Sequence, residues 1–285
     1  GTVMGFDGEK LSRALGIAGT MASGLVCVFG TDAKLVNVGN AVSNGLKAAV
    51  LAGKGCTVPG DVIEREGGYA QAVSQTRNFK YLCPQDGDEL RIRDSYYKIH
   101  AACGHTHSAL DALQKIKKAQ DFAWDQVESV SVHAYKKAVE LTGAFRCETE
   151  LKAKFSMPYC IAAMLVYGEA GLMQFTEEVR NDPRIHGLKH RIKVEEDISY
   201  TEEYPILRIE RLSVTLKDGR KWEEEVELPE GKPPREYIRA KFLSLAGLTI
   251  DRDRAARIME QVLSLTMESP MNRLGDGLRG ELNGG

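Results

Sequence analysis

The chain has 285 residues, which is enough for one large domain or for two domains of ordinary size. Hydrophobic residues make up 43% of it and charged residues 27%, a composition typical of a globular protein with a sizeable core. The formal net charge is -2, so no overall positive field attracts nucleic acid or an anionic membrane. An anionic ligand therefore has to be bound by a local cluster of cations.

Cysteine usage bears on the cellular compartment. The six cysteines are scattered and form no Cys-x-x-Cys pair: Cys27, Cys56, Cys83, Cys103, Cys147 and Cys160. Isolated thiols in apolar stretches favour a reducing compartment over a disulfide scaffold. No apolar run reaches the roughly 18 residues of a membrane-spanning helix, and the first residues lack a signal-peptide pattern. We therefore expect a cytoplasmic protein.

Small residues characterise the first two predicted helices. In residues 8–29, Ala14, Ala18 and Ala22 recur at i, i+4 spacing, with Gly16 and Gly19 between them. This pattern predicts a buried helix that another helix approaches closely. A second helix is predicted over residues 40–52, with Asn40 as its N-cap and glycines just after its end. The segment is therefore expected to be all-helical and tightly packed.

Residues from about 98 to 230 mix helical and strand patterns. Apolar residues at helical spacing predict a helix over residues 108–120, and a second is predicted over residues 156–167, with Pro158 in its first turn. Alternating apolar residues predict strands near residues 130–134, 192–194, 207–216 and 222–228, with a hairpin turn at Asp218-Gly219. We interpret this region as an α+β domain with a mainly antiparallel sheet.

Turn-forming stretches suggest the domain boundaries. Gln85-Asp86-Gly87-Asp88 follows Pro84, and Pro233-Pro234 precedes two helices predicted over residues 235–246 and 251–266. We predict part of an all-helical domain in residues 1–80, a smaller α+β domain in 81–232, and C-terminal helices in 233–285 that return to the helical domain. Because a helical pattern follows Gly1 almost at once, we expect the helical domain to be incomplete at its N-terminus.

Lys34 is the first candidate site residue. It precedes the helix predicted at Asn40, and the N-terminus of a helix offers unpaired N–H groups and a partial positive charge. A lysine beside such a helix end suits a carboxylate, although a solvated lysine is the simpler interpretation. Lys98, further along the chain, has the same two interpretations.

A histidine-rich run follows Lys98. His100, Cys103 and His107 resemble a zinc site superficially, but their spacing is not a usual ligand pair and no second cluster completes a tetrahedral set. A zinc protein that uses these three residues stays an alternative. A free histidine has a pKa near 6.5, which suits proton transfer by His107 after Thr106, or His107 simply caps the next helix. We interpret His100 and His105 as surface or packing residues.

Tyr159 is the third candidate. It stands in the first turn of an apolar helix, after Phe155-Ser156-Met157-Pro158. A buried tyrosine seeks a hydrogen-bond partner for its hydroxyl, so Tyr159 either faces a cleft between domains or is an ordinary core residue.

Three segments of the chain, in this order, resemble the MmgE/PrpD family: Thr31 to Ala41, Lys98 to Asp111 and Ala153 to Ala163. The resemblance implies an active site built from two sets of residues. The catalytic set is Lys34, His107 and Tyr159, and the substrate-binding set is Lys98, Thr106 and Asn40. It further implies chemistry without a metal or other cofactor, on small di- or tricarboxylates.

The resemblance also sets the expected activity. It implies a hydro-lyase similar to 2-methylcitrate dehydratase, with a cis-aconitate-type decarboxylase or an epimerase of the same family as alternatives. Family members begin with a further helical segment that supplies an aspartate and histidines to the site. The expected partners are thus a carboxylate substrate, a second copy in a homodimer, and a second chain if the missing segment comes from one. A non-catalytic subunit stays a further alternative.

Overall fold

The computed structural model describes residues 1–76, 78–79, 82, 87, 92, 95, 97–228, 235–266, 269, 275 and 278. It divides into two compact units, residues 1–228 and 229–285. Apart from Gly87, the turn predicted at residues 85–88 and the Pro233-Pro234 pair lie outside the described residues. The domain boundaries at residues 80 and 232 stay predictions.

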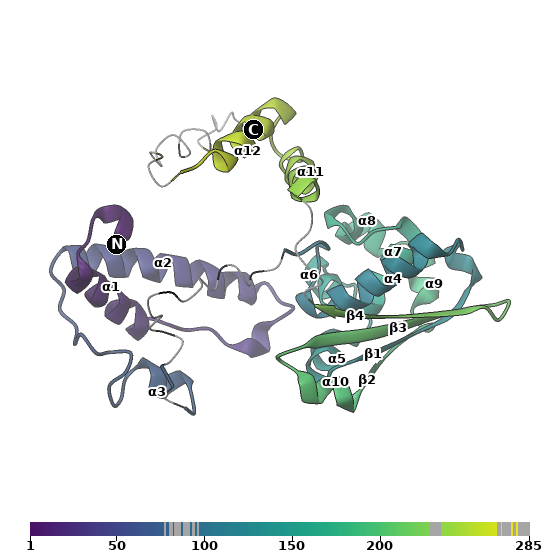
Figure 1. The fold of residues 1–285 in the computed structure, drawn as a ribbon, viewed down its shortest axis with the longest axis horizontal. Helices are drawn as coiled ribbons and strands as arrows, with labels where there is room; N and C mark the ends of the chain where they lie inside the picture. Colours follow the sequence, from purple (N-terminus) through teal and green to yellow (C-terminus); the bar gives the residue numbers. More distant parts are fainter. Residues whose placement is uncertain are drawn as a thin grey trace. The chain divides into compact units, whose positions relative to one another are not determined.

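The first unit contains the four strands that the structure describes (Figure 1). Its α-helices are α1 (Gly8–Thr20), α2 (Ala33–Gly53), α3 (Tyr69–Val73), α4 (His107–Ala119), α5 (Lys136–Thr142), α6 (Glu150–Lys154), α7 (Met157–Tyr167), α8 (Glu177–Arg180), α9 (Pro183–Leu188) and α10 (Ile198–Glu203). Its strands are β1 (Val127–Ala134), β2 (Ile192–Glu196), β3 (Arg208–Leu216) and β4 (Lys221–Leu228). Short 3-10 helices are η1 (Thr2–Met4), η2 (Val26–Val28), η4 (Gly104–Thr106), η5 (Trp124–Gln126) and η6 (Leu172–Phe175).

The four strands form one mixed sheet in the order β2-β1-β3-β4. The β1–β3 and β3–β4 pairs are antiparallel, as predicted, and Gly219 adopts a φ of 89° in the predicted hairpin turn. The β1–β2 pair is parallel, which the sequence did not predict because side chains alternate in the same way in both kinds of pair. A parallel pair needs a long crossover, and α5 to α9 lie within it.

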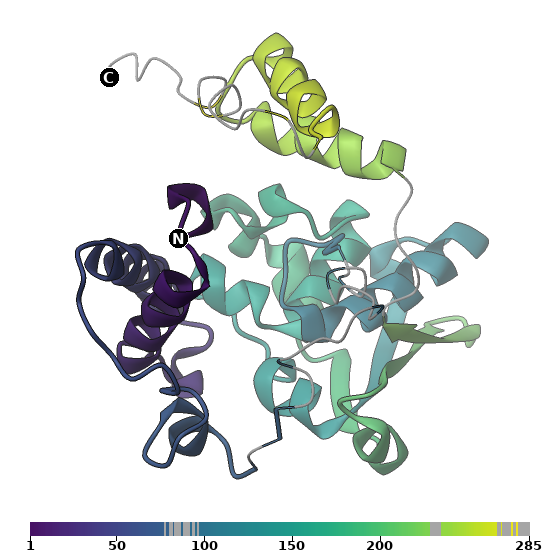
Figure 2. The same cartoon turned by 60° about the vertical axis from the view of Figure 1, so that its left-hand side comes forward.

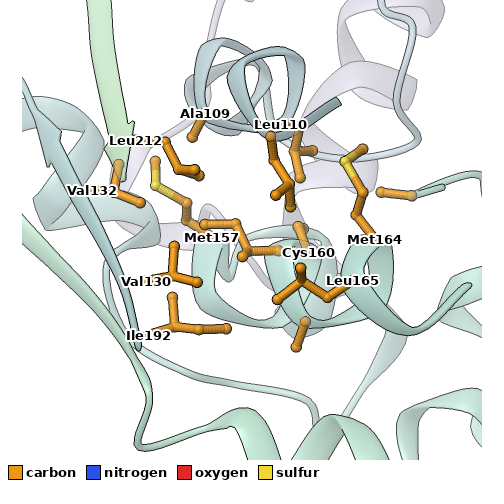
Figure 3. Close-up of a cluster of buried hydrophobic side chains, with 14 of the residues drawn as sticks. Ala109, Leu110, Val130, Val132, Met157, Cys160, Met164, Leu165, Ile192 and Leu212 are labelled. Atoms are coloured by element: carbon orange, nitrogen blue, oxygen red, sulfur yellow. The ribbon is translucent and has the colours of Figure 1, made fainter. Parts of the chain in front are cut away.

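The core lies between the sheet and helices α4 and α7. Figure 1 shows these two helices on one side of the sheet, where α4 contacts β3 and β4 and α7 contacts α4 and β2. Every residue of α7 from Met157 to Leu165 is buried, as expected for a helix that is apolar on all sides. Figure 3 shows Leu110 of α4, Val132 of β1 and Cys160 of α7 within this core.

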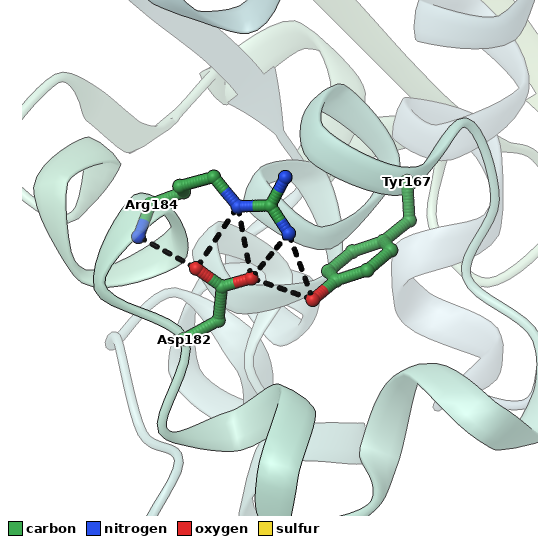
Figure 4. A network of polar contacts seen from close by, with 3 residues as sticks. All are labelled: Tyr167, Asp182 and Arg184. Carbon is green, nitrogen blue, oxygen red and sulfur yellow. Dashed lines mark hydrogen bonds and ion pairs between the residues drawn. The ribbon is translucent and has the colours of Figure 1, made fainter.

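A polar network fixes the end of α7 to the start of α9 (Figure 4). The Tyr167 hydroxyl donates to the Asp182 carboxylate over 2.5 Å, and the same carboxylate pairs with the Arg184 guanidinium over 2.7 Å. It also caps α9 by accepting from the backbone N–H of Arg184. The hydrogen bonds from Arg184 hold the pKa of Asp182 below its ordinary value, so the cap stays charged at the positive end of the helix. The network is therefore structural.

The N-terminal helices differ from the prediction in their bounds. The helix predicted over residues 8–29 is α1, which ends at Thr20, and Gly24 beyond it adopts a φ of 125° that no α-helix contains. The predicted close approach is present at Gly16, where an added Cβ would lie 3.0 Å from a methyl group of Val58. The prediction that Asn40 caps the second helix was wrong: α2 begins at Ala33, and Asn40 lies exposed in its interior.

The reason for this error is physical. Glycine and asparagine favour helix boundaries, but a helix tolerates each in its interior at a cost of about 1 kcal/mol or less. In α2 the Gly39-Asn40 pair is continuous with helical turns on both sides. As a result Lys34 is in the first turn of α2 itself, and Asn40 follows nearly two turns later.

One side of α2 is apolar and exposed. Its buried residues Ala48 and Ala52 pack with Ile17 of α1, whereas Leu35 and Leu46 are 60% and 67% exposed. Other exposed apolar side chains on α2 are Val36, Val38, Val42, Val50 and Leu51. A helix with such a surface is normally covered by further helices. The incomplete helical domain, the homodimer and the second chain stay predictions.

The second unit contains α11 (Arg235–Ala246) and α12 (Arg252–Leu263), which pack against each other (Figure 2). Both helices were predicted, and Asp251 caps α12 as expected by accepting from the Arg254 N–H over 2.8 Å. Their return to the helical domain stays a prediction. Across the described residues of both units, no helix combines the length and the apolar character that crossing a bilayer requires.

Candidate active site

The start of α4 is fixed by the segment that precedes it. The backbone N–H of Cys103 donates to the Lys154 carbonyl over 2.8 Å, which joins this segment to the end of α6. The Thr106 hydroxyl is fully buried and donates to the Cys103 carbonyl over 2.8 Å. Thr106 therefore shapes the turn into α4, and this hydrogen bond orients its hydroxyl toward the backbone.

His107 is the first residue of α4 and is only 2% exposed. One ring nitrogen is bonded to the Ala102 carbonyl, while Nε2 has no partner among the described residues. Only Nδ1 remains for the carbonyl, so the proton is on Nδ1 and Nε2 presents a lone pair. Burial, reinforced by the neighbouring His100, lowers the pKa of His107 to about 4. The ring is therefore a neutral proton acceptor near neutral pH.

His100 supports this histidine. Its ring is 5.2 Å from the ring of His107 and is 4% exposed, so the interpretation as a packing residue is confirmed. Its Nε2 is bonded to the Asp111 carboxylate over 2.9 Å. Among the residues that the structure describes, no three His, Cys, Asp or Glu side chains are grouped so that they could hold a metal ion.

Two lysines act on the same segment. The Lys98 ammonium donates to the Ala102 carbonyl over 3.2 Å, the same carbonyl that accepts from His107. Burial raises the pKa of the Cys103 thiol, and both Lys98 and Lys34 counteract that rise. Lys34 therefore lies within electrostatic range of the turn that leads into α4, although α2 and α4 are far apart in the sequence.

Aromatic rings position Lys34. Its ammonium is 5.0 Å from the centre of the Phe29 ring and 5.2 Å from that of Phe155, and the two rings meet edge to face. Phe155 directly follows Lys154, whose carbonyl holds Cys103. A cation over two aromatic faces is stabilised without losing its charge, so Lys34 remains able to attract an anion.

Tyr159 has its described contacts in the core, and Asn40 is exposed on α2. The Tyr159 side chain is fully buried, between the rings of Phe145 and Phe175, and its hydroxyl donates to the Gln174 carbonyl over 2.6 Å. Burial also raises its pKa. The described contacts thus link Lys34, Lys98, Thr106 and His107 to one region and do not link Tyr159 or Asn40 to it. Catalysis by Tyr159 stays a prediction.

Glu210 belongs to this region and was missed. It lies on β3, is 1% exposed, and accepts from the Ala109 N–H over 2.7 Å in the first turn of α4. Its other carboxylate oxygen has no partner among the described residues, and burial raises its pKa well above the ordinary range. The available signal was a carboxylate two residues before Leu212, on the face of the strand that the apolar residues occupy.

His105 and Tyr135 were also missed as a pair. His105, which we interpreted as a surface or packing residue, is partly buried, and its Nδ1 is 2.5 Å from the hydroxyl oxygen of Tyr135. Tyr135 is 1% exposed and directly follows β1. No sequence signal joined the two residues, because they are 30 positions apart.

Comparison with known proteins identifies the family. The model of the MmgE/PrpD C-terminal domain matches residues 100–265, and that of the MmgE/PrpD N-terminal domain matches residues 1–82. A cis-aconitate decarboxylase from Aspergillus terreus (strain NIH 2624 / FGSC A1156) is 26% identical over 289 residues, which cover 93% of this chain and 58% of the relative. A human cis-aconitate decarboxylase is 24% identical over 279 residues, 92% of this chain and 56% of the relative.

The 2-methylcitrate dehydratase, mitochondrial, of Yarrowia lipolytica (strain CLIB 122 / E 150) is 24% identical over 210 residues, which cover 69% of this chain and 40% of the relative. The chain thus spans less than two thirds of the length of each of these relatives. Because the two domain models together match most of its residues, the chain belongs to the MmgE/PrpD family.

Proposed function

We propose that the chain forms the catalytic part of a lyase that acts on a small di- or tricarboxylate. His107 transfers the proton, and Lys34 and Lys98 attract the carboxylates. The observation that carries this proposal is the buried Nε2 of His107, which has no partner among the described residues, on a ring whose other nitrogen shares the Ala102 carbonyl with the Lys98 ammonium. A buried, neutral nitrogen near cations can accept a proton from an anionic substrate once the bound anion raises its pKa toward the operating pH.

The chemistry requires those cations. When the carbon next to a carboxylate loses a proton, the electron pair spreads onto that carboxylate and its negative charge rises. A cation about 4 Å away stabilises a unit charge by on the order of 4 kcal/mol at an effective dielectric constant near 20. Desolvation of the two charges reduces this gross value. Two lysines and the first turn of α2 thus suit two of the carboxylates of such a substrate.

The first candidate reaction is elimination of water, as in a hydro-lyase of the 2-methylcitrate dehydratase type. His107 Nε2 takes the proton from the carbon, the carbon–oxygen bond breaks, and the imidazolium so formed returns that proton to the hydroxyl, which leaves as water. The lone pair on Nε2 supports this direction, because an unprotonated ring can accept a proton at once.

Decarboxylation of the cis-aconitate type is the second candidate. Relatives with that name match 92–93% of this chain, whereas the Yarrowia dehydratase matches 69%. In this reaction a carbon–carbon bond breaks, carbon dioxide leaves, and the remaining electron pair on carbon takes a proton. His107 delivers that proton once a bound trianion has raised its pKa.

A substrate screen distinguishes the candidates. The chain is incubated with 2-methylcitrate, citrate, cis-aconitate and iminodisuccinate, with and without a chelator, and products are identified by proton NMR while carbon dioxide is trapped. We expect an alkene and no carbon dioxide from the hydro-lyase, or carbon dioxide from the decarboxylase. A Lys34→Met variant, which lacks the ammonium group, is compared with the unmodified chain and is expected to show reduced turnover. A folded chain that converts none of the four compounds would contradict the proposal and favour a non-catalytic subunit.

A further inference from the structure

His105 and Tyr135 form a hydrogen-bonded pair beside the start of α4. The Nδ1 of His105 and the Tyr135 hydroxyl oxygen are 2.5 Å apart, and their rings meet edge to face at 5.7 Å. Tyr204 stacks on Tyr135 with ring centres 4.6 Å apart. The tyrosine is therefore held rigidly, and with it the orientation of the imidazole.

This hydrogen bond sets the tautomer of His105. Burial raises the pKa of Tyr135, so its hydroxyl keeps the proton. Among the described residues that hydroxyl has His105 Nδ1 as its hydrogen-bond partner, and a buried O–H donates to the acceptor it has. Nδ1 thus accepts, and the ring proton is on Nε2. Nε2 of His105 is therefore an N–H donor, whereas Nε2 of His107 presents a lone pair.

The surroundings of His105 are positively charged. Burial, followed by Arg208, Lys137 and Lys98, lowers the pKa of His105 to about 4, so the ring is neutral near neutral pH. Lys137 is paired with Glu140 over 3.3 Å, whereas Arg208 has no ion pair among the described residues. Burial shifts the nearby Glu210 toward its uncharged form. Among the described residues, no ion pair therefore neutralises the charge of Arg208.

We propose that His105 Nε2–H and the Arg208 guanidinium bind one carboxylate of the substrate, and that Tyr135 is a positioning residue that holds His105 as the donor tautomer. The Ser108 hydroxyl donates to the Arg208 carbonyl over 3.2 Å, which ties Arg208 to the same turn of α4 that holds His107. A tricarboxylate needs a third recognition group beyond Lys34 and Lys98, and this pair supplies it. The inference rests on the proposed function, because it takes a small carboxylate as the ligand.

Binding of citrate, a stable tricarboxylate, tests the pair in the full 285-residue chain. Calorimetry is expected to show that His105→Leu weakens citrate binding by about 10-fold or more, the usual loss for a hydrogen bond to a charged group. His105→Gln keeps an N–H donor and is expected to retain most of the affinity. His190→Gln, at an exposed histidine, is the matched control and is expected to bind as the unmodified chain does. Unweakened binding by a folded His105→Leu variant would overturn the proposal.

Nitrogen NMR of the histidine-labelled, unmodified chain tests the tautomer without any variant. We expect His105 to show a protonated Nε2 and an unprotonated Nδ1, and Tyr135→Phe to abolish that preference. A protonated Nδ1 in the unmodified chain would overturn the role of Tyr135, even if the leucine variant fails to fold. Citrate binding through His105 without turnover of any carboxylate would keep this inference and end the proposed function. If the chain converts a carboxylate and His105→Leu converts it at the same rate, the proposed function stands and this inference fails.

Discussion

Replacing His107 with glutamine is expected to lower kcat by about 10²- to 10⁴-fold on whichever carboxylate the chain converts, because the variant lacks the proton acceptor. Glutamine is close in size and keeps an N–H for the Ala102 carbonyl, so the first turn of α4 is expected to stay in place. The measurement is steady-state turnover, accompanied by far-ultraviolet circular dichroism to verify folding. His190→Gln is the control and is expected to turn over normally.

The pH dependence of kcat/KM gives the same prediction a second readout. Because the pKa of His107 is lowered to about 4, the free enzyme holds it as a neutral base down to that pH. The acidic limb of the kcat/KM profile is therefore expected near pH 4, and not near the ordinary imidazole value of about 6.5. An acidic limb near pH 6.5, or a kcat that the glutamine variant leaves unchanged, would contradict the role of His107.

Replacing Glu210 with glutamine is expected to make the free energy of unfolding less dependent on pH. The unmodified chain is expected to lose stability as pH rises, and the variant is not. An unfolded glutamate titrates near pH 4.3, and burial raises the pKa of Glu210 in the folded chain. Above pH 4.3 the folded state thus binds more protons than the unfolded state, so the free energy of unfolding falls with pH. The fall continues up to the folded pKa, with a slope of at most about 1.4 kcal/mol per pH unit. Glutamine has no such titration.

Urea denaturation between pH 5 and pH 8 measures the effect as the difference in unfolding free energy between Glu210→Gln and the unmodified chain. We expect the variant to gain relative stability steadily as pH rises. Glu210→Ala leaves the Ala109 N–H without its acceptor and is expected to lose about 1–3 kcal/mol at pH 5. Glu195→Gln, exposed on β2, is the control. A difference that is constant over the whole pH range would show that Glu210 is ionised when folded.

The α+β region was predictable because its sequence signals are local and agree with each other. Period-two alternation located the strands, and in the helix over residues 157–167 the Pro158 position and Gly168, with its φ of 83°, marked the two ends. The N-terminal helices were less predictable, since Gly39 and Asn40 carry a boundary signal inside α2. There the continuous helix prevailed over the preference of two residues.

The site was predictable only in part, for a related reason. The histidine and two lysines stand in recognisable motifs, and the structure places His107, Lys98 and Lys34 around one turn. Glu210 and Tyr135 contribute through contacts between elements that are distant in sequence. No local pattern joined Tyr135 to His105, and the local signal for Glu210 was its position on the apolar face of β3. Tyr159 is the opposite case. Its motif is recognisable in the local sequence, but the motif did not predict that its hydroxyl donates to the Gln174 carbonyl.

The most direct test of the account is a double-mutant cycle on kcat/KM with Lys34→Met and His107→Gln, measured on the substrate that the screen identifies. If an ammonium from α2 and an imidazole from α4 act on one bound carboxylate, removing both is expected to cost less than the sum of the separate losses. The difference is expected to be about 0.5–3 kcal/mol. Losses that add within about 0.3 kcal/mol would place the two side chains in separate sites and contradict the account.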